Sequence, residues 1–166
     1  NATSGAVVLS ADTIAAAYSD TAANLIAAFT GITSHTGGLT VSDTVAVSAS
    51  DLNTINTFKA AGATTVTATS EITGTSADLV TVIGAVTHGT DVTFTITGGA
   101  ATIAELIAIN NATSGTVVLS ADTIATAYND TAANLAAAFD GITTSTSTLT
   151  LTGAATTIAE LTTINN

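Results

Sequence analysis

Thr75-Ser-Ala-Asp78-Leu79 decides the fold, because five other stretches repeat its form along the 166 residues. Each has Ser or Thr, two variable residues, then Asp, Asn or Glu, then Leu. The six phrases end at Leu25, Leu52, Leu79, Leu106, Leu135 and Leu161, so the residue numbers of successive leucines differ by 27, 27, 27, 29 and 26. A regular period of about 20–50 residues is typical of a solenoid, in which each unit buries its apolar face on its neighbours.

The phrase has the form of a helix start. A Ser or Thr hydroxyl can accept a hydrogen bond from the amide three residues on, and an acid at that position can reach back, which is a capping box. A second apolar residue follows each leucine by three or four positions, which places both on one helical face. These second residues are Phe29, Ile55, Ile83, Ile109, Phe139 and Ile164.

A short strand precedes each helix. In residues 92–97, Val92, Phe94 and Ile96 alternate with threonines, so the apolar side chains face inward and the threonines outward. Similar runs occur at 7–9, 39–41, 66–67, 117–119 and 149–152. Residues 10–18 and 120–128 fit either a strand or a helix, and Ser10 and Ser120 as caps favour a helical turn.

These patterns predict a single right-handed solenoid domain over 1–166, with a parallel sheet along one side. Each of the six coils, about 27 residues long, is a short strand followed by a short capped helix. The six leucines are expected to form one buried column. The predicted coils span approximately 1–30, 31–57, 58–84, 85–111, 112–140 and 141–166.

A duplication lies above the coil repeat. Residues 1–34 match residues 111–144 at 28 of 34 positions, and residues 95–111 match 150–166 at 12 of 17. The chain starts and stops at the same phase of its repeat, so we expect an excerpt of a longer repeating protein or a processed product. Both ends interrupt the same repeat pattern, so their surfaces are expected to be complementary. This predicts head-to-tail stacking with identical copies or covalent continuation into more repeats.

Composition restricts the function. Twelve acids face one base, Lys59, and give a formal charge of −11, which excludes a nucleic-acid binder and disfavours an anionic membrane surface. No apolar run reaches the roughly 20 residues of a membrane span. Thr supplies nearly a quarter of the chain, and a surface of Thr, Ser and Asn is typical of secreted structural proteins. Sequons at Asn1, Asn111 and Asn129 are candidate glycan sites.

Three segments resemble a family of very large, Thr-rich repeat proteins of bacterial cell surfaces, found in cyanobacteria and proteobacteria. They are Val41-Ser-Asp43-Thr44, Asp20-Thr-Ala-Ala-Asn-Leu25 and its copy Asp130-Thr-Ala-Ala-Asn-Leu135. The resemblance implies secretion, a solenoid, and a role in surface layers, adhesins or extracellular filaments. It assigns no functional residue.

Few residues suggest chemistry. No calcium-binding loop spacing occurs, and the acids are better explained as helix caps and turn formers. No cofactor is therefore expected, with Asp12, Asp20, Asp122 and Asp130 as the candidate ligands if calcium binds. His35 and His88 lie in glycine-bearing loops without a second histidine at metal spacing, and we expect both to be solvated. We expect no enzymatic activity.

The sequence thus favours a structural protein of an extracellular fibre or cell-surface layer. The alternative is an ice-binding or adhesin module, because regular Thr-x-Thr rows on a flat sheet can order water. Coils one and five carry Val-Val-Leu at that place and would interrupt the row. The candidate ice-face residues are Thr65, Thr67, Thr93, Thr95, Thr148 and Thr150.

Overall fold

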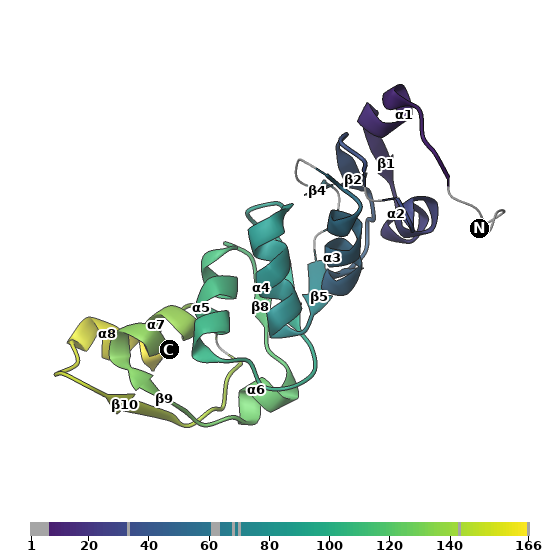
Figure 1. Cartoon of the computed structure of the whole chain (residues 1–166). Coiled ribbons are helices and arrows are strands. Elements are labelled where there is room, and N and C mark those ends of the chain that lie inside the picture. Colours follow the sequence, from purple (N-terminus) through teal and green to yellow (C-terminus); the bar gives the residue numbers. More distant parts are fainter. Residues whose placement is uncertain are drawn as a thin grey trace.

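The computed structural model describes residues 7–165 except residues 33, 61–63, 68, 70 and 143. This part of the chain is an elongated α/β structure with eight helices and parallel sheets (Figure 1). The helices are α1 (Ala11–Ala15), α2 (Ala22–Phe29), α3 (Ala49–Thr57), α4 (Ser76–Ala85), α5 (Ile103–Asn111), α6 (Ala121–Ala125), α7 (Ala132–Phe139) and α8 (Ile158–Ile164).

Each repeated phrase starts a helix, which confirms the predicted caps. In all six, the Ser or Thr side chain accepts a hydrogen bond from the amide three residues on. Among the six, the reciprocal bond, in which the carboxylate accepts from the cap backbone amide, is present only in α5 and α8, at Glu105 and Glu160. In α4, the shorter Asp78 carboxylate instead accepts from the Thr75 hydroxyl at 2.8 Å.

The long helices pack in one row. α2, α3, α4, α5, α7 and α8 each contact the next, as the ribbon shows (Figure 1). Five of the repeated leucines are at most 2 % exposed, whereas Leu161 on α8 is 44 % exposed, so its predicted burial is wrong. In α4 the second buried position is Val82 and not Ile83. The buried five are Leu25, Leu52, Leu79, Leu106 and Leu135.

The strands form three parallel sheets, so the prediction of a single sheet is wrong. The first contains β1 (Tyr18–Asp20), β2 (Leu39–Val41), β4 (Thr64–Val66) and β6 (Val86–Thr87). The second contains β3 (Val47–Ser48), β5 (Glu71–Gly74), β7 (Thr93–Ile96) and β8 (Val117–Val118). The third contains β9 (Tyr128–Thr131) and β10 (Leu149–Thr152).

Unequal spacing of strands and helices explains this division. In the first sheet, two residues that pair across neighbouring strands are separated by fewer positions along the chain than two successive helix leucines are. Successive strands therefore lie further ahead of their helix: Tyr18 closely precedes Leu25, whereas Val86 is far ahead of Leu106. The gap leaves room for a new strand beside the helix. The second sheet begins there, at Val47, directly before α3.

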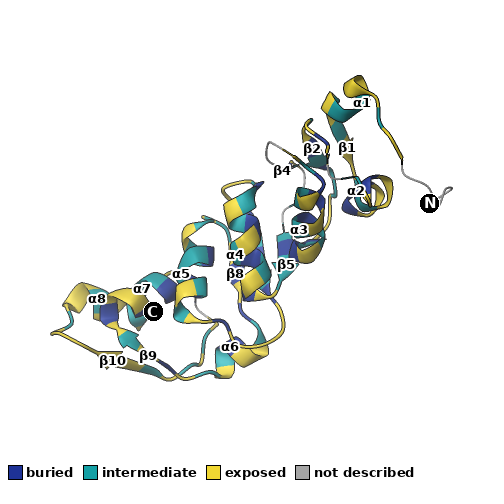
Figure 2. Ribbon diagram, viewed as in Figure 1, coloured by how far each residue is buried: buried dark blue, intermediate teal, exposed yellow. Residues whose placement is uncertain are grey.

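The alternating pattern predicts the strand faces well. Val92, Phe94 and Ile96 are at most 2 % exposed, while Thr93 and Thr95 of the same strand are half-buried. Figure 2 shows the buried residues along the middle of the molecule, between the helices and the sheets. The apolar core thus continues from one repeat to the next.

The extra segments of the two long repeats are helical. Ser10 and Ser120 cap α1 and α6, which confirms the preferred alternative. The strands that follow, β1 and β9, are not predicted from the sequence, because each holds one apolar residue, Tyr18 or Tyr128. Residues 117–118 form β8, whereas the identical residues 7–8 pair with no strand in the described part of the chain.

Candidate functional site

The candidate ice-face threonines do not share one sheet. Thr65 lies in β4 of the first sheet, Thr93 and Thr95 in β7 of the second, and Thr150 in β10 of the third. Thr67 and Thr148 directly flank β4 and β10. A different hydroxyl row follows from the register of the first sheet, at the usual strand separation of about 4.8 Å. That row consists of Ser19, Thr40, Thr65 and Thr87.

The candidate calcium ligands serve helix starts. Asp20 Oδ1 accepts from the Asn24 side chain and from the Thr21 amide, each at 2.8 Å, and Asp130 repeats both contacts before α7. The side-chain bond first, and then the backbone bond, lower the pKa of Asp20. Asp12 and Asp122 lie in the first turns of α1 and α6. Among the described residues, no three metal-binding side chains come together.

The histidines differ from each other. His35 is fully buried against Tyr18 and Phe29, with ring centroids 5.5 and 4.9 Å away, so the expectation of a solvated loop residue is wrong. Its backbone bridges to Lys59 in a parallel pair, and this non-local contact brings the ring inside. His88 is half-buried and packs edge-on against Phe94.

Two apolar faces are exposed at opposite ends of the row of repeats. The leading face consists of Val7 and Val8, which are 59 % and 90 % exposed, and the outer side of α2 with Ala28. The trailing face consists of Leu151 of β10 and of Ile158 and Leu161 of α8, which are 38 %, 84 % and 44 % exposed. The outer side of α8 is correspondingly exposed in Figure 2.

Four of these six residues have copies that are buried in the middle of the chain, whereas Val118, the copy of Val8, is 41 % exposed and Ile103, the copy of Ile158, is half-buried. Val117, the copy of Val7, is 7 % exposed, and Ala138, the copy of Ala28, is fully buried. Leu106, the copy of Leu161, is fully buried as well. These residues meet where β8 pairs with β7 and α7 packs on α5. The exposed faces therefore carry copies of residues from both sides of a contact that is made within the chain.

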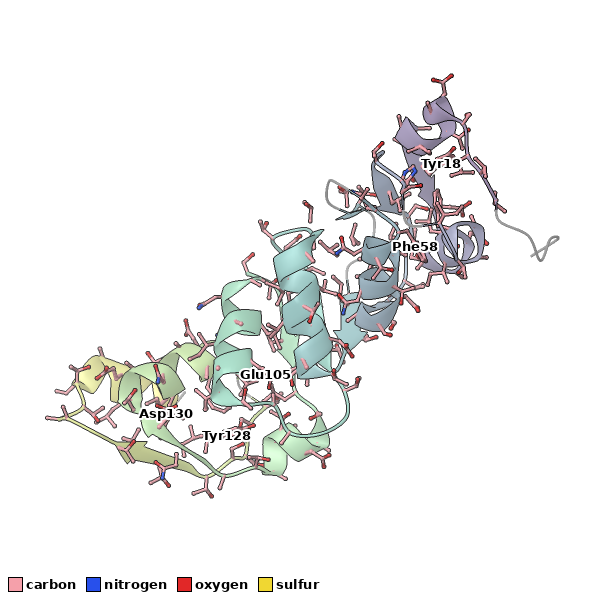
Figure 3. All side chains as sticks on the ribbon, in the orientation of Figure 1. Tyr18, Phe58, Glu105, Tyr128 and Asp130 are labelled. Carbon is pink, nitrogen blue, oxygen red and sulfur yellow. The ribbon has the colours of Figure 1, made fainter. Side chains whose placement is uncertain are left out.

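This internal contact is specific in its polar bonds. The Tyr128 hydroxyl donates to the Ala101 carbonyl at 2.8 Å, and the Ala101 amide donates to the Thr123 hydroxyl at 3.1 Å. Asn110 Nδ2 donates to two carbonyls of the α7 end, those of Ala137 and Asp140, both at 3.1 Å. Figure 3 shows Tyr128 and Glu105 in this region, and burial raises the pKa of the Tyr128 hydroxyl.

The candidate glycan sites are on the surface where they are described. Asn111 and Asn129 are exposed, while Asn1 lies outside the described residues. Over that part of the chain, every helix is too short or too polar to cross a bilayer. No protein-family model matches this sequence, and no curated protein or solved structure is similar to it.

Proposed function

We propose that this chain is a structural, non-enzymatic element of an extracellular fibre or cell-surface layer. In this proposal the repeats form a solenoid that lengthens end to end, by contact with identical copies or with further repeats of the same kind. The observation that carries it is the pair of apolar faces at the two ends, each of which includes copies of residues that are buried mid-chain. Exposed apolar faces of this kind mark association sites.

The placement of the reactive side chains supports a structural role. Glu160 and Glu105 complete capping boxes, Asp20 and Asp130 hold helix starts, and His35 lies in an aromatic cluster. The surface is rich in Thr and Ser and carries few charges, which supports an extracellular location of the kind known for bacterial surface proteins. Exposed Asn111 and Asn129 would accept glycans there.

Electron microscopy of the concentrated chain tests the proposal. We expect unbranched filaments or ordered arrays whose axial repeat matches the length of one chain. Immunolabelling of intact source cells should place the protein outside the cell. Dispersed 16.1 kDa monomers at every concentration, or labelling only after permeabilisation, would contradict the proposal.

Ice binding is the second candidate, and the hydroxyl row of the first sheet favours it. Ser19, Thr40, Thr65 and Thr87 present one hydroxyl on each strand in register. The second sheet places Val118 beside Thr95 and so interrupts its own row. On the structural proposal, we expect a thermal hysteresis assay to show no freezing gap. A gap that Thr65→Tyr abolishes, while Thr81→Tyr at an exposed position of α4 leaves it unchanged, would establish ice binding instead.

A further inference from the structure

The duplication relates both halves of the internal contact to the exposed faces. Adding 55 to the residue numbers places β7 over most of β10 and the start of α5 at the start of α8, and subtracting 110 converts β8 and α7 into residues 7–8 and α2. The backbone follows the sequence at these copies. Gly98 and Gly153, which follow β7 and β10, both have positive φ (77° and 96°), and so do Gly141 and Gly31 after α7 and α2 (70° and 86°).

We propose that residues 7–9 and α2 of one copy dock on β10 and α8 of a second copy, in the register of the internal contact. Within the chain, Phe94 pairs with Val117, and Thr95 with Val118. The same register pairs Leu149 with Val7 of the second copy, and Thr150 with its Val8. This inference rests on the proposed function and assigns the surfaces that end-to-end growth would use.

The free edge of β10 has the geometry that this docking needs. β7 pairs with β5 on one side and β8 on the other, whereas β10 pairs with β9 alone among the described strands. Its second edge corresponds to the edge of β7 that β8 occupies. An unpaired strand edge beside exposed apolar side chains is a template for another strand. The valines of residues 7–8, which have no strand partner in the described part of the chain, fit that place.

The polar bonds of the internal contact also have counterparts. Asn165 occupies the place of Asn110, so its side-chain amide would donate to carbonyls at the end of α2 in the second copy. Thr13 and Tyr18 occupy the places of Thr123 and Tyr128, whose hydroxyls bond the Ala101 backbone. Both are half-buried here, whereas Thr123 and Tyr128 are buried. The docking would therefore add polar bonds between copies as well as cover apolar area.

The two faces are different surfaces, so the contact is heterologous and leads to open chains of copies. That property gives a sharp test by sedimentation velocity, in about 0.5 M salt to screen the −11 charge of each copy. Val7→Asp disables the leading face and Leu161→Asp the trailing face. Each variant alone should remain at 16.1 kDa, with association weakened roughly 100-fold or more, because docking would bury an unpaired carboxylate.

A mixture of the two variants should form a heterodimer and nothing larger, because one functional leading face then meets one functional trailing face. Val45→Asp is the matched control, since Val45 is 67 % exposed but lies on neither face, and it should assemble like the parent chain. Ile158→Asp is a second variant of the trailing face and should block assembly as Leu161→Asp does. It is not expected to unfold α8, because an acid at the first residue of a helix is favourable. Circular dichroism should show every variant folded.

Cross-linking tests the register. The chain has no cysteine, so Val8→Cys and Thr150→Cys can be mixed and joined by a short thiol cross-linker. We expect a covalent dimer from this pair and none when Thr40→Cys replaces Thr150→Cys. If the aspartate variants of both faces assemble like the parent chain, the docking mode is overturned but the proposed function stands. A parent chain that stays monomeric at all concentrations would overturn both.

Discussion

Replacing Leu79 with alanine is expected to lower the free energy of unfolding by about 2–5 kcal/mol. Leu79 is fully buried on α4, between the neighbouring helices α3 and α5. The truncation removes apolar contacts and leaves a cavity, because both neighbours are held by their own caps and strands. Urea denaturation followed by circular dichroism would measure the loss as a lower midpoint.

Leu161→Ala is the matched control for this experiment. Leu161 occupies the same position of the repeated phrase, but it is 44 % exposed and contacts α7 on one side of α8. The same chemical change should therefore cost about 1 kcal/mol or less in the monomer. Equal losses at the two positions would show that burial in the row of helices is not what stabilises the fold.

Acidification below about pH 6.5 is expected to destabilise the chain through His35. Its ring is fully buried, and neither ring nitrogen has a hydrogen-bond partner among the described residues. Burial first, and then the charge of Lys59, lower the pKa of His35. Well above its ordinary pKa the histidine is neutral in both the folded and the unfolded state. As the pH falls, His35 binds a proton in the unfolded state but stays neutral in the folded state, so the free energy of unfolding decreases.

His35→Leu removes this dependence. One proton limits the slope to about 1.4 kcal/mol per pH unit, and denaturation between about pH 5 and 7 should show the slope disappear in the variant. At neutral pH the variant should also be about 1–3 kcal/mol more stable, because it replaces buried unpartnered nitrogens with apolar atoms. The control is His88→Leu, which removes the other, half-buried imidazole. An unchanged slope in His35→Leu would assign the acid sensitivity to other groups.

Local features of the fold can be predicted from the sequence. A helix cap depends on residues three positions apart, so the form of Thr75-Ser-Ala-Asp78 is enough to place the start of α4. The alternation over residues 92–97 likewise places Phe94 inside, because a strand exposes its two faces in turn. Regular spacing extends such local rules to all six repeats.

Features that depend on distant residues cannot be predicted in this way. The division of the strands into separate sheets arises from small differences between the spacing of the strands and that of the helices. A single average period conceals these differences. His35 resembles a loop residue until the bridge to Lys59 encloses it. Leu161 has the same local sequence as Leu106, but Leu106 is covered because α7 packs against α5. The exposed faces follow from comparing such copies in three dimensions.

The nearest-neighbour packing of the helices has a mechanical consequence. Each long helix between α2 and α8 packs against the long helices before and after it, and all three sheets end within the chain. Tension along the row would therefore act on one junction after another and detach repeats singly from an end. A freed repeat of about 27 residues lengthens the chain by roughly 90–100 Å, at about 3.3–3.6 Å per residue. Such a chain would yield stepwise under load and dissipate the work without breaking a covalent bond.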